Sequence, residues 1–361
     1  MDLEEVKYWV GFSFIPGIGR VRYSLLDDHF GSLSAAWNAS NGELRASGLD
    51  ERSVNSIMDM RPRISLDAEW EKLKQYNVNV VTCKDSGYPA RLKEVDNHPP
   101  LLYIRGSLID EDECSIAVVG TRRVSAYGRQ VAEEITADLS RAKVTVVSGL
   151  ARGVDYVAHQ SAIMAKGRTI AVMPCGLDVV YPGEHVDLAQ RVIEHGALVS
   201  EFPLGSRPKA DHFPQRNRIM SGMSLGVLVI ESGERSGALI TAHLAAEQNR
   251  EVFAVPGSIY SPTSKGPNKL IQEGAKLVCS CAEVLEELDL PVVSRQLEMD
   301  GLAPATDTEY QLLCCLSEEA AHINDVCHRS GLPIAVVSGM LTMLELRGLV
   351  KQVGGMTYTI S

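Results

Sequence analysis

Long hydrophobic runs are missing from this sequence. No stretch of its 361 residues approaches the roughly 20 consecutive apolar residues that a membrane-spanning helix needs, so we expect no membrane as a partner. The first five residues, Met-Asp-Leu-Glu-Glu, lack the positive charge and the apolar segment of a secretory signal. These two absences predict a cytoplasmic protein.

Closely paired cysteines are also missing. The eight cysteines are scattered, and none belongs to a Cys-x-x-Cys pair. Cys279 and Cys281 are separated by one residue, which does not match a zinc-ligand spacing, and no close histidine completes a set of four ligands. A disulfide framework is not expected in a long chain without an export signal. We therefore predict no metal site and no other cofactor.

Positive charge is scarce and unevenly distributed. The chain has 35 Lys and Arg against 46 Asp and Glu, a formal net charge of -11. Residues 113–276 contain 18 basic and 16 acidic residues, whereas the remainder contains 17 basic and 30 acidic. Binding of a polyanion needs positive charge on one face rather than a basic average. The middle of the chain can therefore carry a basic groove, while both ends repel polyanions or meet a basic partner.

Short helical segments separated by glycine breaks occupy residues 1–65. This pattern predicts a small helical domain of the SAM or helix-hairpin-helix type. Its segment Pro16-Gly17-Ile18-Gly19 lies between two helical stretches. A glycine turn of this kind can present backbone N–H groups to a phosphate. A plain turn between two helices explains the segment equally well.

Apolar, β-rich runs alternate with helical stretches from residue 115 onward. We expect strands at 116–119, 144–147, 170–173, 198–199, 227–230 and 252–255, and helices at 126–141, 154–166, 184–195 and 238–249. Continuous apolar strands that alternate with helices imply a parallel sheet covered on both faces. Residues 66–288 are therefore predicted to form one α/β domain, an extended Rossmann-like, doubly wound sheet. Two further strands, at 78–82 and 101–104, extend it.

The end of the chain predicts a separate module. Residues 289–306 have the composition of a linker, and residues 307–361 are predicted to form three helices followed by a β-hairpin, a winged-helix-like arrangement. The third helix, at 334–347, contains a single basic residue, Arg347. A helix that lies along phosphates needs several. This favours packing or protein interaction over the role of a transcription regulator.

Small residues and arginines follow nearly every predicted strand, at the edge where doubly wound sheets bind ligands. Gly, Ser and Thr loops at helix N-termini bind phosphate through backbone amides and hydroxyl groups. Several such loops in a row suit a chain of phosphates or one large nucleotide. The candidate binding residues in these segments are Gly120, Arg122, Arg123, Ser148, Gly149, Arg152, Lys209, Arg216, Asn217, Arg218, Ser236, Gly237 and Thr241.

Familiar catalytic signatures are absent from these segments. Gly120-Thr-Arg-Arg-Val-Ser does not match the Gly-x-Gly-x-x-Gly dinucleotide fingerprint, and no Walker A sequence occurs. There is no Gly-x-Ser-x-Gly nucleophile elbow either. These absences argue against a dehydrogenase, a P-loop ATPase and a serine hydrolase. We predict a protein without catalytic residues.

Phe213 is the informative aromatic residue in a chain with 6% aromatics. It stands between His212 and Pro214, in a segment that the sequence predicts to be an irregular polar loop, three residues before Arg216. One interpretation is a hydrophobic anchor that holds the loop on the sheet. The other is a platform on which nucleic-acid bases stack, flanked by phosphate contacts.

Several segments together resemble the DNA processing protein A family (DprA, also called Smf). They are Val118-Val-Gly-Thr-Arg-Arg, Ser148-Gly-Leu-Ala-Arg-Gly-Val-Asp, Gly176-Leu-Asp-Val-Val-Tyr-Pro, His212-Phe-Pro-Gln-Arg-Asn-Arg-Ile, Ser236-Gly-Ala-Leu-Ile-Thr-Ala and Gly266-Pro-Asn-Lys-Leu-Ile-Gln-Glu-Gly-Ala. The match runs through about residues 80–288 in one order and spacing. The helical N-terminus and the winged-helix-like tail are similar to that family's usual additions.

The resemblance implies a homodimer that binds and protects incoming single-stranded DNA and loads the RecA recombinase onto it in natural transformation. It implies DNA contacts for Arg122, Lys209, Phe213, Asn217 and the arginines beside Asn217. It also implies that Gly120, Ser148 and the loop at 236–237 bring the backbone close to the strand.

An enzymatic alternative stays open. The predicted fold is similar to nucleotide phosphoribohydrolases of the lysine-decarboxylase-like fold, which cleave a base from a nucleoside monophosphate. Those enzymes carry a Pro-Gly-Gly-x-Gly-Thr-x-x-Glu loop, and residues 231–238 occupy the equivalent place here.

Overall fold

The computed structural model describes residues 2–290, 307–316, 321–346 and 349–360. The chain divides into two compact units, Met1–Val293 and Ser294–Ser361. Most of the predicted linker at 289–306 lies outside the described residues. No helix in the described part of the chain is both long and apolar enough to cross a membrane.

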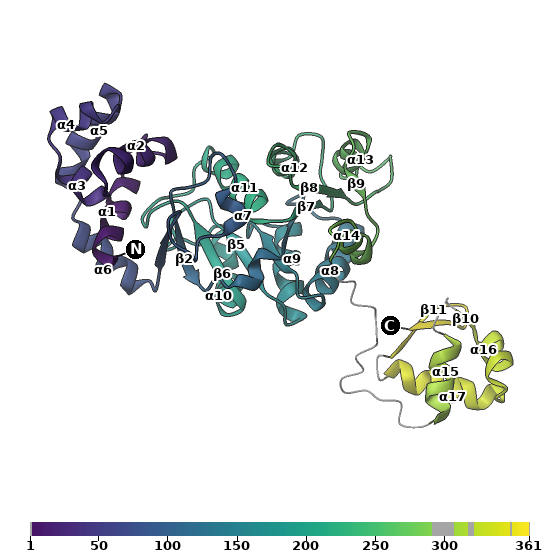
Figure 1. Cartoon of the computed structure of the whole chain (residues 1–361). Coiled ribbons are helices and arrows are strands. Elements are labelled where there is room, and N and C mark those ends of the chain that lie inside the picture. The colour runs from purple at the N-terminus through teal and green to yellow at the C-terminus, as the bar shows by residue number, and fades with distance from the viewer. Residues whose placement is uncertain (1, 291–306, 317–320, 347–348, 361) are drawn as a thin grey trace. The chain divides into compact units, whose positions relative to one another are not determined.

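Six α-helices begin the first unit. They are α1 (Leu3–Ser13), α2 (Arg20–Phe30), α3 (Leu33–Asn38), α4 (Asn41–Ala46), α5 (Glu51–Met60) and α6 (Leu66–Gln75), with a 3-10 turn η1 (Arg61–Arg63). Side chains set the boundaries: Asp50 caps α5, and Gly31 ends α2 in the left-handed conformation. Trp9, Phe12 and Tyr23 share one buried cluster with sheet residues such as Tyr103. The helices therefore pack on the edge of the sheet, as Figure 1 shows beside β2.

A nine-stranded sheet forms the centre of the first unit. Its strands are β1 (Asn79–Thr82), β2 (Leu101–Gly106), β3 (Ser115–Val119), β4 (Thr145–Ser148), β5 (Thr169–Val172), β6 (Gly196–Ser200), β7 (Gly226–Val229), β8 (Glu251–Ala254) and β9 (Lys276–Leu277). Their order is β1-β2-β6-β5-β4-β3-β7-β8-β9. β1 and β2 run antiparallel, β2 is antiparallel to β6, and the other neighbours are parallel. The predicted doubly wound sheet with two added strands is confirmed.

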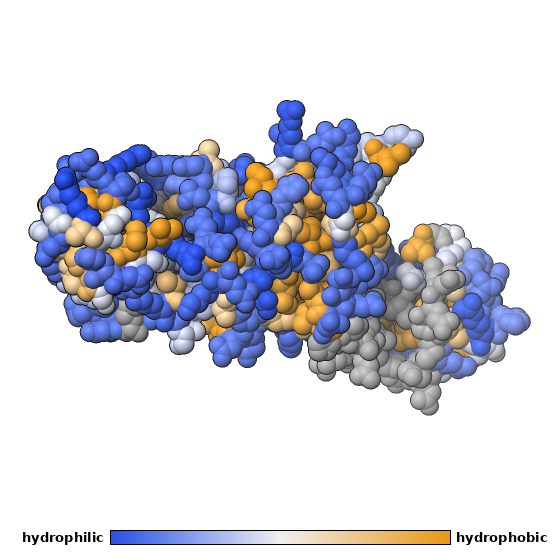
Figure 2. Space-filling model, turned by 45° about the horizontal axis from the view of Figure 1, so that its top comes forward, coloured by the Kyte–Doolittle hydropathy of each residue, from blue (hydrophilic) through white to orange (hydrophobic). Residues whose placement is uncertain are grey.

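Helices cover both faces of this sheet. The helices that follow the N-terminal six are α7 (Ala90–Lys93), α8 (Ala126–Arg141), α9 (Val154–Met164), α10 (Val186–His195), α11 (His212–Met223), α12 (Gly237–Glu247), α13 (Lys265–Gln272) and α14 (Cys281–Glu287), with the 3-10 turns η2 (Asp110–Glu113) and η3 (Gly183–His185). Residues of α7, α11, α12 and α13 share one buried cluster, and residues of α8, α9 and α14 share another. Figure 2 shows hydrophilic residues over much of the visible face, with groups of hydrophobic residues between them, several of them near the middle of the view.

The order of the strands creates a switch point between β3 and β7. From β3 the chain adds β4, β5 and β6 in one direction and then returns to add β7 on the other side of β3. The chain therefore leaves β3 and β7 toward opposite sides, and this switch point is where doubly wound folds bind ligands.

The prediction of an irregular loop at 212–218 is wrong, because this segment forms the first turns of α11. Pro214 is the third helical residue, a position where its missing N–H leaves no intrahelical hydrogen bond unmade. Further along, Ile219, Met220 and Met223 bury the helix against the sheet. Phe213 and Arg216 therefore lie on a rigid element rather than in a loop.

The second unit has its own small sheet and core. Its elements are α15 (Asp307–Cys315), β10 (Ala321–His322), α16 (Ile323–Ser330), α17 (Ile334–Leu346), β11 (Val350–Gly354) and β12 (Thr357–Ile360). The strands are ordered β10-β12-β11. Leu312, Val326, Val337, Leu341 and Leu344 form the centre of its core. The three predicted helices and the hairpin are present.

Candidate nucleic-acid interface

The buried carboxylate of Glu231 occupies the switch point. It accepts hydrogen bonds from the Ser125 backbone N–H (2.9 Å), the Ser125 hydroxyl (2.7 Å) and the Thr263 hydroxyl (2.9 Å). Gly128 is pressed against it, since a Cβ there would come within 2.3 Å of Oε2. A negative charge therefore already sits at the N-terminus of α8, which is the place where the sequence predicts an external phosphate.

The loop after β4 has a similar internal acceptor. The buried Asp155 carboxylate accepts the N–H groups of Gly149 (3.2 Å) and Ala151 (3.4 Å). Burial raises the pKa of Asp155 above its ordinary value, against the opposing influence of the Arg216 charge and of these two hydrogen bonds. The backbone amides of this loop thus serve the protein's own carboxylate.

Arg216 and Asn217 lie in the frame beneath the surface. The Arg216 guanidinium donates to the Val172 carbonyl (2.7 Å) and to the Asn217 side-chain oxygen (3.0 Å). The Asn217 amide in turn donates to the Gly237 carbonyl (3.3 Å), which links α11 to α12. Both side chains are buried, and Ser148 is also buried, donating to the Val118 carbonyl. These three candidates therefore hold the neighbouring elements together from below and are not accessible to a ligand.

Arg122 and Phe213 meet at the surface above this frame. The guanidinium carbon of Arg122 lies 5.4 Å from the centre of the Phe213 ring, a cation–π contact. Arg122 is exposed, and Phe213 is half-buried in the first turn of α11. The Tyr181 ring contacts the Phe213 ring edge-on, and the two ring centroids are 5.8 Å apart. Tyr181 is not among the residues predicted from the sequence, although the Tyr181-Pro182 pair lies inside one of the family-like segments.

The remaining basic candidates differ in whether a carboxylate pairs with them. Arg123 and Lys209 are exposed, and within the described residues neither forms an ion pair. Arg152 is held by Glu184 at 2.7 Å. Arg218 is held by Glu201 and is mostly buried.

The last candidates are small residues at the start of α12 and in the loop after β3. Ser236 caps α12 by accepting the Ala238 N–H (3.3 Å), Gly237 is exposed, and Thr241 is buried. Gly120 is half-buried, and a Cβ there would come within 2.5 Å of the Val154 side chain. Among the candidates, Arg122, Arg123, Lys209 and Gly237 are exposed without an ion pair in the described part of the chain, Phe213 and Ser236 are half-buried, and Arg152 is exposed but paired with Glu184.

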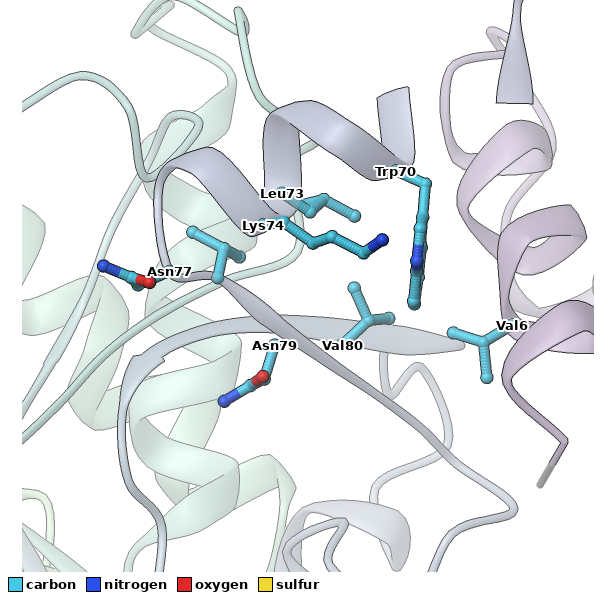
Figure 3. Close-up of a pocket in the computed structure, with 8 residues that line it drawn as sticks. Val6, Trp70, Leu73, Lys74, Asn77, Asn79 and Val80 are labelled. Carbon is cyan, nitrogen blue, oxygen red and sulfur yellow. The ribbon is translucent and has the colours of Figure 1, made fainter. Parts of the chain in front are cut away.

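Two hollows lie toward the N-terminal helices. A groove of about 890 Å³ runs between the 16–19 turn and the start of α11, where Phe202 and His212 stack with centroids 4.0 Å apart. A smaller pocket of about 410 Å³ lies against β1. Figure 3 shows Trp70 standing between Lys74 and Val6 there. Across the described ranges, no group of three or more His, Cys, Asp or Glu is placed to hold a metal ion.

Fold and site define a Rossmann-like protein with a cationic and aromatic rim at its strand ends, followed by a second, small winged unit. The family model for DNA recombination-mediator protein A matches residues 79–289, and the model for the DprA winged helix domain matches residues 296–356. The chain belongs to the DNA recombination-mediator protein A (DprA) family, which confirms the resemblance seen in the sequence.

Individual relatives agree with this assignment. Protein Smf of Escherichia coli K12 is 38% identical over 326 residues, which cover 86% of this chain and 85% of the relative. DNA processing protein DprA of Bacillus subtilis is 44% identical over 217 residues, 60% of this chain and 73% of the relative. The crystal structure of Streptococcus pneumoniae DprA matches with a TM-score of 0.67 at 36% identity, covering 78% of this chain and 97% of that one.

A second solved structure is that of DprA from Helicobacter pylori, described in terms of its single-stranded DNA binding mode. It matches with a TM-score of 0.54 at 26% identity and covers 59% of this chain and 96% of that chain.

Proposed function

We propose that this protein binds single-stranded DNA along the strand-end rim and acts, without catalysis, as a recombination mediator. The observation that carries the proposal is the Arg122 guanidinium over the half-buried Phe213 ring. Arg123 follows Arg122 in the chain, Lys209 precedes α11, and both are exposed. An aromatic face stacks with any base, and the cations meet the phosphates. Such a site discriminates unpaired from paired strands because the bases of a duplex are not available for stacking.

Binding through side chains replaces the amide cradle that the sequence suggests. Glu231 and Asp155 engage the amides after β3 and β4, so phosphates must be met chiefly by Arg122, Arg123 and Lys209. The exposed Gly237 lies at the start of α12, which adds one helix N-terminus to this rim. Each phosphate contact adds to the dependence of affinity on salt.

The family supplies the wider role that we propose. The H. pylori relative is described by its binding to single-stranded DNA, and several relatives are named DNA processing proteins. We infer a cytoplasmic homodimer that protects incoming DNA in transformation and loads RecA onto it. The RecA part is tested by following RecA filament formation on single-stranded DNA with and without this protein. An unchanged rate of filament formation would contradict loading.

The phosphoribohydrolase alternative finds little support in residues 231–238. The Glu231 carboxylate is buried and bonded to Ser125 and Thr263, which leaves it poorly placed to act on a nucleotide. Release of free base from AMP by the purified protein would revive this alternative.

Fluorescence anisotropy with single- and double-stranded oligonucleotides at two salt concentrations tests the binding proposal. We expect single strands to bind more tightly. Arg122→Ala should flatten the slope of log K against log salt by about 0.7, the value of one phosphate contact on a single strand. Phe213→Ala should weaken binding by about 1–3 kcal/mol without changing the slope.

Arg141→Ala is the matched control, because Arg141 is an exposed arginine at the other end of α8, in an ion pair with Asp138. It should leave affinity and slope unchanged. Equal affinity for single and double strands, or no binding of single strands below micromolar concentration, would refute the proposal.

A further inference from the structure

Two adjacent hydrophobic side chains stand almost fully in solvent beyond the end of β8. Ile259 is 75% exposed and Tyr260 is 90% exposed. Single exposed apolar residues are ordinary on protein surfaces, but a neighbouring pair at the tip of one loop suggests a contact surface.

Hydrogen bonds hold this loop in shape. The Ser261 N–H donates to the Ser258 carbonyl (3.0 Å), and the Tyr260 N–H donates to the Ser258 hydroxyl oxygen (3.3 Å). At its far end the Thr263 carbonyl accepts the Ser232 N–H (2.7 Å). The loop therefore presents Ile259 and Tyr260 in a fixed place at little further cost in entropy.

The loop is continuous with the rim that carries Arg122. Glu231 binds Thr263 of this loop and Ser125 of the loop after β3 through the same carboxylate. The Tyr127 hydroxyl, on α8, also donates to the Pro256 carbonyl (2.8 Å). Because β3, β7 and β8 are neighbours spaced about 4.8 Å apart, the loop after β8 begins only about 10 Å along the sheet from the loop after β3.

The surface between the two loops favours a polyanion. Arg123 and Arg235 are exposed, and within the described part of the chain no carboxylate pairs with either. Lys265 lies 3.7 Å from Glu234, so that pair adds no net charge. The two exposed arginines, Arg123 and Arg235, therefore add positive charge to the surface, whereas the Glu231 carboxylate is buried.

We infer that Tyr260, with Ile259 beside it, is a second base-stacking platform for the same single strand that Phe213 contacts. The strand would cross the ends of β3, β7 and β8, with its phosphates near Arg123 and Arg235. This inference rests on the proposed function and extends it, because it assigns the bound strand a path across the sheet.

Affinity measured against oligonucleotide length tests the inference. Oligonucleotides of about 4 to about 20 nucleotides span the range of single-strand site sizes. Tyr260→Ala should leave the affinity for the shortest ones unchanged and weaken that for the longest by about fivefold or more. Tyr260→Phe should bind like the unaltered protein, because the ring is retained. Tyr76→Ala, which removes an exposed tyrosine after α6, is the matched control.

A direct readout comes from Tyr260→Trp. The natural tryptophans Trp9, Trp37 and Trp70 all lie in the N-terminal helices, so a new signal at 260 is separable by difference. Long single strands should quench the new fluorescence, and short ones should not.

Unchanged affinity of Tyr260→Ala at all lengths, or an equal loss at all lengths, would overturn the inference. A change in sedimentation without a length-dependent loss of DNA affinity would assign the tip to a second copy of the chain and would also overturn it. If the unaltered protein binds no single strand, the proposed function itself fails, which is a distinguishable result.

Discussion

Gly149 lies against the guanidinium group of Arg216, in the buried frame beneath the rim. A Cβ at this position would come within 1.8 Å of the Arg216 Nη1 atom. Gly149→Ala must therefore displace a buried side chain that is bonded to the Val172 carbonyl. We expect a loss of about 1–3 kcal/mol in the free energy of unfolding, measured by urea denaturation. Gly237→Ala is the control, since its Cβ would have no neighbour within 4 Å, and it should change stability far less.

His159 makes stability depend on pH. Its Nε2 atom accepts the Leu150 N–H (3.3 Å), and burial, together with the nearby Arg216, lowers its pKa from 6.5 to about 3. The folded protein keeps this histidine neutral while the unfolded chain protonates it, so its contribution is complete above pH 6.5 and declines as the pH falls toward 3. We compare the free energy of unfolding of His159→Gln with that of the unaltered protein at pH 7 and pH 5.

Between pH 7 and pH 5, the free energy of unfolding of the unaltered protein should fall by about 2 kcal/mol relative to that of His159→Gln. Glutamine retains an acceptor for the Leu150 N–H and cannot be protonated in this range. A difference that stays constant with pH would show that His159 does not remain neutral in the folded state.

The fold brings together some of the residues that the sequence singles out, and their role in DNA binding stays a prediction. Arg122 and Phe213, which belong to two separate segments of the sequence, meet in the fold because both follow strands at the carboxyl edge of the parallel sheet. The burial of Arg216 and Asn217 was not predictable from composition. An arginine is usually exposed, and its orientation depends on the helix that carries it and on acceptors such as the Val172 carbonyl.

The sequence predicted the elements that have a strong apolar pattern, but it predicted a loop where α11 begins. Strand β3 was expected at 116–119 and spans Ser115–Val119, since a buried parallel strand is a continuous apolar run. Helix α11 begins with His-Phe-Pro-Gln-Arg-Asn-Arg, in which Pro214 and the polar residues suggest a loop. Its helical state depends on the burial of Ile219 and Met220 against the sheet, which only the assembled fold supplies.

Glu231 joins three elements at the switch point, and its removal should loosen all of them. Glu231→Ala leaves the Ser125 N–H and the hydroxyls of Ser125 and Thr263 without their acceptor, which costs about 1–3 kcal/mol of stability. We expect faster amide hydrogen exchange at residues 120–128 and 256–264, measured by mass spectrometry. Glu234→Ala, in the same loop but exposed, should leave both segments as protected as before. Faster exchange spread evenly over the sheet would contradict a local role.

At the scale of the whole molecule, the two units have separate cores. Among the residues that the structure describes, the clusters within Met1–Val293 contain none of the second unit, and the core around Leu341 contains none of the first. The composition of residues 289–306 predicts a linker between the two units. Each core therefore has the means to stabilise its own unit.

The chain that ends at residue 293 should consequently fold and bind single-stranded DNA as well as the full chain does. Residues 294–361 carry four basic and eight acidic residues, and α17, the third helix of the winged unit, has no lysine or arginine. Their removal deletes net negative charge, so the affinity should stay the same or rise slightly, and more so at low salt. Thermal unfolding and anisotropy on both chains measure this. A loss of binding in the shortened chain, with its unfolding transition intact, would place the winged unit on the DNA and would assign it more than the protein-interaction role that its nearly uncharged third helix favours.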